Sequence, residues 1–482
     1  MIVTLLTKEE LLEAVKGQEI GNAECIFNDV QTDSRNVSPE KKCMFVPLIG
    51  EFQNGHKYIP DVLAKKASLI LLNKSEYKKD KDLYEKLAKE NSDVCFVAVE
   101  NTLTALQNAA EAYVNKVAKN MIRVSITGSS GKTTTKEMMV AVCKAYFGDE
   151  NVAYTKGNFN SETGLPLSVF KIKGSEKIGV FEMGMNRENE IGEISKVWKS
   201  QYGIITNIGT AHIGILGSRE NIAKEKRKSF AYIPENGSAF VCASDSYGDF
   251  CFENVKGKKI KYGPEVDEKV SGVKFLEDKG LFGSRFSLDG LEVKLSLSGL
   301  YNYTNALSVV ACAKAIGIPA EFIKKGLESV TAVSGRMETK QVLLKNNKKA
   351  ILIKDCYNAN LDSMLKVIDF CNSLKEIGKK IFVLADMKEL GAESKKSHQI
   401  IGQEVNKVAP DYIFMIGQEM KAGYDILQNK EKAFWYEEKG QDTFCKIADK
   451  INSVADENDV ILLKGSHSME LENLLPLLVN EE

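Results

Sequence analysis

A glycine- and serine-rich turn between an apolar run and a helix-like segment is the clearest chemical signal in the chain. The stretch is Met121–Val140, MIRVSITGSSGKTTTKEMMV. Strand, glycine turn and helix together point backbone N–H groups and a helix N-terminus at a phosphate. Gly128 and Gly131 would let the backbone approach the phosphate oxygens. Lys132 would reach the terminal phosphates, and Thr133 would bind the accompanying Mg2+.

The loop is a variant of the general pattern G-x-x-x-x-G-K-[ST], because Ile126 stands where that pattern has its first glycine. We expect the shortened form, TGSSGKT, to bind a nucleotide triphosphate. The residues predicted to contact it are Gly128, Ser129, Ser130, Gly131, Lys132, Thr133 and Thr134.

Length and composition indicate an ordinary globular protein of about three domains, since 482 residues exceed one hydrophobic core. Lys+Arg (65) and Asp+Glu (66) nearly cancel, which argues against binding to nucleic acid or to an anionic membrane through a broad basic surface. The ten cysteines form no C-x-x-C pair and no regular spacing, so we expect reduced, mostly buried thiols. The N-terminal residues lack a signal-peptide pattern, no stretch is long enough for a membrane span, and we expect a cytoplasmic protein.

The elements predict an α/β protein with three domains. Residues 1–99 form a small N-terminal α/β domain, with strands expected at Cys25–Asp29, Cys43–Leu48, Ser68–Leu72 and Val94–Val99. Residues 100–332 form a central nucleotide-binding domain. Residues 333–482 form a C-terminal Rossmann-like, doubly wound domain, with strands expected at Ala350–Lys354, Lys380–Ala385, Tyr412–Ile416, Ala433–Tyr436 and Val460–Lys464.

Polar residues follow several predicted strands of the central domain. Glu182 ends one strand and is placed to hold the Mg2+ of a nucleotide, and His212 follows the next strand, Tyr202–Thr206. The segment Lys156–Phe170 is rich in Asn, Gly and Thr, and its amides would hold a polar ligand. Glu220–Phe230 predicts a helix with a solvated basic face, from which nothing singles out Lys226.

The later part of the central domain changes character. Short β-rich runs at Ile260–Tyr262, Val273–Leu276, Arg285–Leu288 and Leu291–Leu297 predict antiparallel hairpins appended to the central sheet. Asn302 and Asn305 lie three residues apart near the start of the next helix, where they would reach an adenine or its ribose.

Loops at the ends of the other domains carry further candidates. Polar clusters follow apolar runs at Thr32–Arg35 and Gly50–His56, and each is as well explained as a plain turn. Polar residues also follow the C-terminal strands, in DCYNAN, DMKELG and KGSH. Arg336, in the linker SGRME, would swing onto a phosphate when the domains close.

The ordered set TGSSGKTTT, GNFNSETGLPL, EMGM, NIGTAH, GLYNYTNA, SGRME, DCYNAN, LADMKELG and LLKGSH resembles the Mur ligase family over nearly the whole chain. Within that family, DSR, DCYNANLDSM and ADMKELG look most like the member that adds D-alanyl-D-alanine to a UDP-N-acetylmuramoyl tripeptide. The resemblance implies an ATP-dependent, ADP-forming ligase of peptidoglycan precursor synthesis that acts through an acyl phosphate. It also implies ATP and two Mg2+ ions as cofactors, small-molecule substrates, no nucleic acid partner and a monomer.

Site roles are carried over by this resemblance. Lys132 would hold the β- and γ-phosphates, and Thr133, Glu182 and His212 would bind Mg2+. Lys226, in K-x-x-x-F, matches the carbamylated lysine of the family. The resemblance therefore replaces the solvated basic face expected for this residue with a role as ligand of a second Mg2+. Lys132, His212 and Lys226 are thus the predicted catalytic residues.

The remaining roles concern ligand contacts. Asn302, Asn305, Arg336 and Asp355 would contact ATP. Residues predicted to bind substrate are Ser34, Arg35, Asn158, Asn160, Thr163, Asn358 and Asn360. The chain departs from the family pattern at Asn54, Lys228 and His467, where Asp, an acidic residue and Arg are usual.

Three alternatives stay open at this stage. A diamino acid-adding Mur ligase predicts a D-N-P-R element, which the chain lacks. A folate polyglutamate ligase shares the phosphate loop but not the full set of motifs. A non-catalytic nucleotide-binding relative would not need Lys132, Thr133, Glu182, His212 and Lys226 together.

Overall fold

The structure is a computed structural model that describes residues 4–21, 23–24, 26–375 and 377–480. The chain divides into two compact units. The first unit comprises Met1–Ser125, Asp149–Gln201 and Lys228–Ile233. The second comprises Ile126–Gly148, Tyr202–Arg227 and Pro234–Glu482.

A five-stranded sheet with the order β1-β5-β4-β3-β2 begins the first unit. Its strands are β1 (Gln18–Ile20), β2 (Asp29–Gln31), β3 (Cys43–Phe45), β4 (Leu69–Asn73) and β5 (Cys95–Val99), and only β1 pairs antiparallel to its neighbour among these described strands. The helices are α1 (Lys8–Val15), α2 (Ile59–Ala64), α3 (Lys74–Lys79), α4 (Lys81–Glu90) and α5 (Thr102–Val117). The parallel strands β4 and β5 are buried throughout, as their unbroken apolar runs predict.

The strand predicted over Cys25–Asp29 is wrong in position. Residue 25 lies outside the described residues, and the observed strand β2 starts only at Asp29. The reason is that Phe27 is engaged elsewhere, since its carbonyl accepts a hydrogen bond of 2.8 Å from the N–H of Leu5. Strand β1 was not predicted, because three residues carry too little periodicity.

The first unit also holds the strand that ends in Glu182. Strand β7 (Val152–Tyr154) pairs parallel with β8 (Ile178–Glu182). Helices α7 (Gly164–Val169) and α8 (Glu190–Trp198) follow β7 and β8, respectively.

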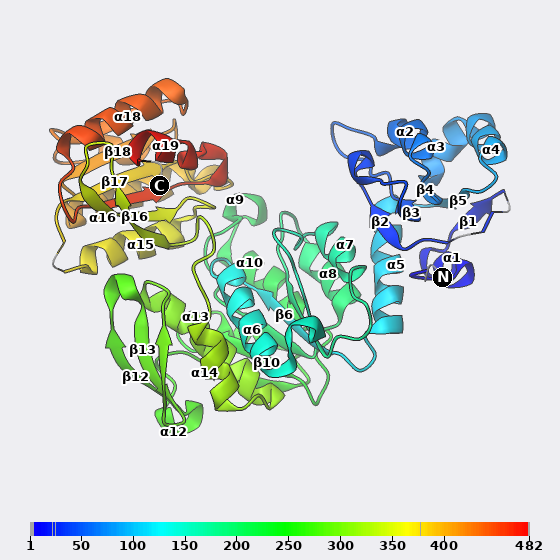
Figure 1. Cartoon of the computed structure of the whole chain (residues 1–482), viewed down its shortest axis with the longest axis horizontal. Helices are drawn as coiled ribbons and strands as arrows, with labels where there is room; N and C mark the ends of the chain where they lie inside the picture. The colour runs from blue at the N-terminus through cyan, green and yellow to red at the C-terminus, as the bar shows by residue number, and fades with distance from the viewer. Residues whose placement is uncertain (1–3, 22, 25, 376, 481–482) are drawn as a thin grey trace. The chain divides into compact units, whose positions relative to one another are not determined.

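The second unit contains the phosphate loop. Strand β6 (Ile122–Thr127) crosses the division between the units and leads into α6 (Lys132–Phe147). Strands β9 (Tyr202–Ile205), β10 (Ser238–Cys242) and β11 (Lys258–Tyr262) are parallel. Short helices α9 (Ile213–Leu216), α10 (Arg219–Lys226), α11 (Gly248–Cys251) and α12 (Glu268–Ser271) lie between them and beyond. Helix α6 packs against α13 (Leu300–Ile316) and α14 (Ala320–Glu328), as Figure 1 shows.

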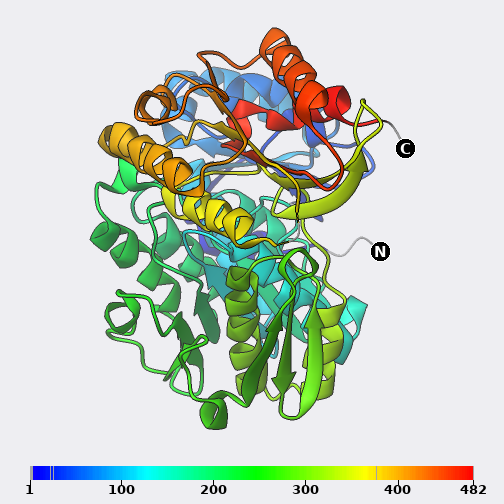
Figure 2. The ribbon, with the colours of Figure 1, turned by 90° about the vertical axis from the view of Figure 1, so that its left-hand side faces the viewer.

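The prediction for the β-rich segment is half right. Strands β12 (Val273–Asp278), β13 (Ser284–Leu288) and β14 (Leu291–Leu295) are antiparallel, but they form a sheet of their own rather than an extension of the central sheet (Figure 2). The run Ile260–Tyr262 belongs to β11, which pairs parallel with β10. Helix α14 contacts β14, so the small sheet is anchored on a helix through its buried residues Val293 and Leu295.

The C-terminal strands form a doubly wound sheet with the order β15-β16-β20-β17-β18-β19. Strands β17 (Lys380–Ala385), β18 (Tyr412–Ile416), β19 (Ala433–Tyr436) and β20 (Val460–Lys464) lie where the sequence predicts them, and β16 extends over Lys349–Asp355. Strand β15 (Glu338–Leu343), antiparallel to β16, was missed because it follows the linker directly. The helices are α15 (Leu361–Ser373), α16 (Ser394–Val408), α17 (Lys421–Asp425), α18 (Gln441–Val454) and α19 (Leu475–Leu478).

Two cores flank this sheet, because alternate residues of a strand face opposite sides. Phe382 and Leu384 pack with α15 and α16, whereas Ile381 and Val383 pack with α18 and α19. This two-sided burial explains why the strands read as continuous apolar runs, and it confirms the predicted α/β fold class.

Two other expectations concern membranes and thiols. None of the helices that the structure describes has the length and apolar character needed to cross a bilayer. Among the described residues eight cysteines are free, as expected: Cys43, Cys143, Cys242, Cys251, Cys312, Cys356, Cys371 and Cys445. The expectation is wrong at Cys95, which is disulfide-bonded.

Candidate active site

The phosphate loop follows β6 and depends on its two glycines. Gly128 has a φ of +153°, and a Cβ there would lie 1.8 Å from Oγ1 of Thr206. Gly131 has a φ of +82°, and a Cβ there would lie 2.8 Å from Oδ1 of Asn305. Both positions therefore require glycine for conformation and for space.

Neighbouring residues hold the loop in shape from the side of β9. The backbone N–H groups of Ser129 and Ser130 donate to the carbonyl (3.0 Å) and the side-chain Oδ1 (3.1 Å) of Asn207. The carbonyl of Ser130 accepts from Oγ1 of Thr206 at 2.6 Å and from Nδ2 of Asn207 at 2.9 Å. The ammonium of Lys132 donates to the carbonyl of Gly128 at 2.9 Å, which places it over the loop.

The start of α6 fits a phosphate group. Gly131 occupies the position before the helix and offers no side-chain cap. The N-terminus of a helix attracts an anion through its first-turn N–H groups and its dipole. Thr133 is buried in that first turn, and Thr134 follows it with partial exposure. A glycine cradle that a Cβ would fill, joined to an uncapped helix N-terminus, is the geometry that holds nucleotide phosphates.

Asn302 and Asn305 lie in the first turns of α13 and face the loop. Nδ2 of Asn302 donates to the carbonyl of Ser298 at 2.9 Å, and Oδ1 of Asn302 accepts from Nδ2 of Asn305 at 3.2 Å. Asn305 is thereby oriented with its amide beside Gly131. Asn305 is the nearer of the two to the phosphate loop, and Asn302 fixes its position.

The loop after β9, Asn207–Gly217, is held by residues from distant parts of the chain. The N–H of Ile208 donates to Oδ2 of Asp245 at 2.7 Å, and the N–H of Gly209 donates to Oγ of Ser129 at 2.9 Å. Both the N–H and the hydroxyl of Thr210 donate to Oδ2 of Asp362, at 2.6 and 2.7 Å.

His212 lies in this loop beside a carboxylate from the C-terminal sheet. Its Nδ1 is 2.7 Å from Oε2 of Glu389. Burial lowers the pKa of His212, and the charges of Lys132 and Lys226 lower it further, whereas Glu389 opposes the shift. The contact with His212 in turn lowers the pKa of Glu389. The direction of this shift favours the neutral imidazole, which is the form that binds metals.

Lys226 ends α10 and is only 1% exposed, so the solvated basic face expected from the helix pattern is wrong at this residue. Burial moves the pKa of Lys226 well below its ordinary value, and the charge of Lys132 lowers it further. The neighbouring Lys224 keeps the expected exposure and pairs with Glu220 at 2.6 Å. The structure therefore singles out one lysine of the cluster as a buried amine with a weakened affinity for its proton.

Glu182 is a buried carboxylate at the end of β8, in the first unit. One of its oxygens accepts a hydrogen bond of 2.7 Å from Nδ2 of Asn160. The N–H of Asn160 donates to the carbonyl of Asn158 at 2.7 Å, and Thr163 precedes α7. The predicted metal carboxylate and the predicted amide segment are therefore in contact within this unit.

Asn360 brings the C-terminal sheet to the phosphate loop. It caps α15 by accepting from the N–H of Ser363 at 2.9 Å, and its Nδ2 donates to Oγ of Ser130 at 3.3 Å. Asn358, two residues earlier, is exposed, and its Oδ1 accepts from the N–H of Ala359.

Arg336 and Asp355 lie in a network at the carboxyl end of β16. The guanidinium of Arg336 stacks over the ring of Tyr357, 3.9 Å from its centre. One oxygen of Asp355 accepts from the N–H of Met337 at 3.0 Å, and the other is 2.6 Å from the buried ammonium of Lys464. The imidazole of His467 also stacks on Tyr357, with the centres of the two rings 5.8 Å apart.

The two predicted contacts in the N-terminal sheet lie on a short 3₁₀ turn after β2. Arg35 is 87% exposed along its side chain and pairs with Asp33 at 2.6 Å. The ammonium of Lys65 donates to the carbonyl of Ser34 at 2.8 Å. The hydrogen bonds from Arg35 lower the pKa of Asp33 to about 2.

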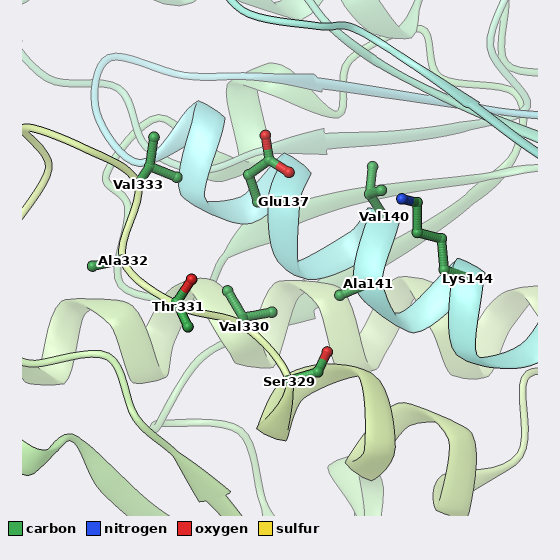
Figure 3. A pocket seen from close by; sticks show the side chains of 9 residues that line it. All are labelled: Glu137, Val140, Ala141, Lys144, Ser329, Val330, Thr331, Ala332 and Val333. Atoms are coloured by element: carbon green, nitrogen blue, oxygen red, sulfur yellow. The ribbon is translucent and has the colours of Figure 1, made fainter. Parts of the chain in front are cut away.

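A separate hollow of about 310 Å³ lies along α6 (Figure 3). Its walls come from the middle and end of α6 and from the segment after α14. The lining residues are Glu137, Val140, Ala141, Lys144, Ser329, Val330, Thr331, Ala332 and Val333. They include none of the residues predicted for the site, so the hollow is not the nucleotide site.

The donor types present suit a magnesium ion that arrives with a nucleotide. Within the described part of the chain, no three or more His, Cys, Asp or Glu side chains gather as a ready metal site. Magnesium bound to a nucleotide needs only one or two protein carboxylates, a hydroxyl and the phosphate oxygens. Thr133 carries a hydroxyl and, in the other unit, Glu182 carries a buried carboxylate. Each is an oxygen donor of the type that magnesium takes.

Sequence reasoning missed the residues that fix the site from outside. These residues, which contact the two loops, are Asn207, Asp245, Asp362 and Glu389. Asp245 follows a strand, and Asp362 stands in the quoted motif DCYNANLDSM. Asn207 and Glu389 stand within the quoted motifs NIGTAH and DMKELG, but their partners are far away in the sequence.

Comparison with known proteins agrees with this geometry. Residues 126–313 match the Mur ligase middle domain, and residues 335–467 match the family described as Mur ligase, glutamate ligase domain. A protein of Treponema pallidum named UDP-N-acetylmuramoyl-tripeptide–D-alanyl-D-alanine ligase is 34% identical, over 99% of this chain and 100% of its own length.

The chain belongs to the Mur ligase family. Among solved structures, MurF from Acinetobacter baumannii matches with a TM-score of 0.81 and 25% identity, over 98% of both chains. MurF ligase from Thermotoga maritima, solved in complex with ADP, matches with a TM-score of 0.76 and 25% identity, over 93% of this chain and 96% of that one. The three-domain α/β fold of a Mur ligase is therefore confirmed, whereas the domain boundaries given above stay predictions.

Proposed function

We propose that this Mur ligase joins D-alanyl-D-alanine to UDP-N-acetylmuramoyl-tripeptide at the expense of ATP. The products are UDP-N-acetylmuramoyl-pentapeptide, ADP and phosphate. The observation that carries the proposal is similarity over the full length to a ligase of that name, together with an intact phosphate loop. The reaction belongs to peptidoglycan precursor synthesis, and so to cell-wall biogenesis, cell shape and division.

The chemistry follows from the weakness of a carboxylate as an electrophile. An oxygen of the tripeptide carboxylate attacks the γ-phosphorus of ATP, the bond to the β-phosphate breaks, and ADP leaves. The amine of D-alanyl-D-alanine then attacks the acyl phosphate, loses a proton, and phosphate departs as the amide forms. The protein's contribution is positioning and stabilisation of charge.

The phosphate loop would hold ATP. The phosphates would meet the ammonium of Lys132 and the N–H groups of Gly128, Gly131, Thr133 and Thr134. Ser129 and Ser130 would contribute their hydroxyls, because their N–H groups already donate to Asn207. Asn305, oriented by Asn302, would contact the adenine side. Arg336 would reach a phosphate and Asp355 the ribose, both from the C-terminal part of the chain.

Thr133, Glu182 and His212 would hold Mg2+. The bound ion would neutralise charge on the transferring phosphate. Asn160, which donates to Glu182, would orient that carboxylate.

Lys226 is the proposed carbamylation site. Its neutral amine would add to the carbon of CO2 and release a proton, which leaves an anionic carbamate with two oxygens. Burial and the charge of Lys132 support this, since they favour the neutral amine over the ammonium. The carbamate would hold a second Mg2+.

The other substrate contacts are assigned to exposed polar residues. Ser34 and Arg35 would contact the uridine diphosphate end. Asn158, Asn160 and Thr163 would contact the muramoyl peptide, and Asn358 and Asn360 would face the dipeptide or acyl group. The enzyme would work in the cytoplasm as a monomer.

A phosphate-release assay with each substrate omitted in turn tests the proposal. Release is expected only with ATP, the UDP-muramoyl tripeptide and D-alanyl-D-alanine together, with lysine and diaminopimelate forms of the tripeptide run in parallel. Turnover that needs a UDP-muramoyl dipeptide and a free diamino acid would identify the other Mur-type ligase instead. Release that needs neither substrate would overturn the proposal.

A further inference from the structure

The contact between Glu389 and His212 joins two sheets that are far apart in the sequence. His212 follows β9, and Glu389 follows β17 of the C-terminal sheet. Nδ1 of His212 lies 2.7 Å from Oε2 of Glu389. The contact is close but is not an aligned hydrogen bond, because the buried Nδ1 has no hydrogen-bond partner among the described residues. No described residue hydrogen-bonds to Nε2 either, so Glu389 lies on one side of the ring and the other side is open.

The two backbone segments that carry His212 and Glu389 are in direct contact. The N–H of Gly214 donates to the carbonyl of Glu389 at 3.0 Å. A Cβ on Gly214 would lie 2.4 Å from the backbone nitrogen of Gly391, and a Cβ on Gly391 would lie 2.8 Å from Cα of Gly214. The two glycines therefore permit an approach that any side chain would prevent.

Both partners adopt an unusual backbone conformation. His212 and Glu389 each have a φ of +64°, in the left-handed region that is uncommon for residues other than glycine. Such conformations persist only where the surroundings hold them, and they concentrate at functional sites and switches. The pair is therefore not an incidental contact of two flexible side chains.

A carboxylate at one nitrogen of a histidine controls what the other nitrogen does. Its negative charge favours the N–H on Nδ1, which leaves the lone pair of Nε2 for a metal, and its contact restrains the orientation of the ring. Partners of this kind commonly contribute 10- to 100-fold to metal affinity.

We propose that Glu389 is a positioning residue for His212, so that the metal site is complete only when the C-terminal sheet is docked on the Asn207–Gly217 loop. This rests on the proposed function, because that function assigns His212 to the metal. Glu389 would thereby make the metal affinity of His212 depend on contact between the C-terminal sheet and the Asn207–Gly217 loop.

The test uses Mn2+ as a spectroscopic substitute for Mg2+, bound to the full chain with the β,γ-methylene analogue of ATP. Electron spin-echo spectroscopy should detect coupling to a histidine nitrogen in the parent protein, and this coupling should vanish in His212→Ala. Glu389→Gln should weaken Mn2+ binding by about 10-fold and reduce the nitrogen coupling. Glu389→Asp should restore part of both.

Two further variants keep the result interpretable. Gly214→Ala changes neither member of the pair but inserts a Cβ against Gly391, so it should weaken Mn2+ binding in the same way as Glu389→Gln. Glu393→Gln removes a nearby carboxylate that is 48% exposed and pairs with Lys396, and it should behave like the parent. Circular dichroism and thermal unfolding would establish that each variant is folded.

The outcomes separate this inference from the function on which it rests. If His212→Ala keeps the nitrogen coupling and the Mn2+ affinity, the assignment of His212 to the metal is wrong, and the inference falls with it. If His212→Ala loses both while Glu389→Gln and Gly214→Ala keep both, the metal assignment stands and the role of Glu389 is refuted.

Discussion

His56 and His212 are both largely buried histidines in loops that follow strands, yet their ring nitrogens meet different groups. Nδ1 of His56 lies 2.8 Å from Oδ1 of Asn54, and its Nε2 accepts from the N–H of Asn73 at 2.9 Å. Nδ1 of His212 meets Glu389, and its Nε2 is left open among the described residues. Both ring nitrogens of His56 have partners in its own part of the chain, whereas His212 has one side of its ring available to a ligand.

His398 follows the pattern of His56. Its Nε2 accepts from the N–H of Met387 at 3.1 Å, and its Nδ1 lies 2.8 Å from the carbonyl of Ser394. Both histidines brace a loop against a neighbouring element. The comparison teaches that the partners of the two ring nitrogens, rather than burial, separate a structural histidine from a candidate ligand.

The largest effect is expected from a change that displaces Thr206, which immediately precedes the loop that carries His212. Gly128→Ala would place a Cβ 1.8 Å from Oγ1 of Thr206, the residue that directly follows β9. We expect at least a ~100-fold loss of kcat/KM and of ATP affinity, because displacements of about 1 Å in a catalytic site have that effect. Gly290→Ala is the control, since Gly290 also has a positive φ but faces open space. Equal losses in both variants would assign the effect to backbone strain alone.

Lys226→Ala should be nearly as damaging. Loss of the proposed carbamate should lower kcat by about 100-fold or more, and small carboxylates should restore part of the activity by occupying the vacated space. Lys224→Ala, at an exposed lysine of the same helix, should keep the parent activity. Steady-state kinetics with and without acetate measure both effects, and an unimpaired Lys226→Ala variant would remove the carbamate from the site.

Asp362→Ala should give a smaller loss. It deprives the N–H and hydroxyl of Thr210 of their acceptor, and one unsatisfied buried group costs about 1–3 kcal/mol. We expect about a 10-fold fall in kcat/KM with an unchanged fold. Asp369→Ala, on the exposed side of α15, is the matched control. A neutral Asp362→Ala would mean that the loop of His212 holds its shape without the C-terminal sheet.

The smallest effect on activity is expected at His56, where the consequence is stability. Burial lowers the pKa of His56 to about 4. The unfolded chain takes up the proton near pH 6.5, and the folded chain does so only near pH 4. Stability should therefore fall as the pH decreases through this window. Urea unfolding at several pH values should show this dependence, and His56→Gln should weaken it while leaving kcat at neutral pH within about 2-fold. A fall in activity as large as that of His212→Ala would contradict the structural role.

Much of the fold was accessible from the sequence. Strands β17 to β20 coincide with the predicted ranges because strands buried on both faces form unbroken apolar runs. The capping box at the start of α1 is of the same local kind, because Thr7 and Glu10 lie three residues apart in the sequence. Strand β1 and the isolated sheet β12–β14 were not, because pairing partners and sheet membership depend on residues far along the chain.

The site shows the same division. By itself, the sequence determined the phosphate loop and the family, because the glycines at 128 and 131 and the Lys-Thr pair act through local conformation and fixed chemistry. Only the tertiary structure decided that Lys226 is buried while Lys224 is exposed, and that Glu389 and Asp362 hold the loop of His212. Burial and contacts between distant segments arise from packing, which no local pattern of residues encodes.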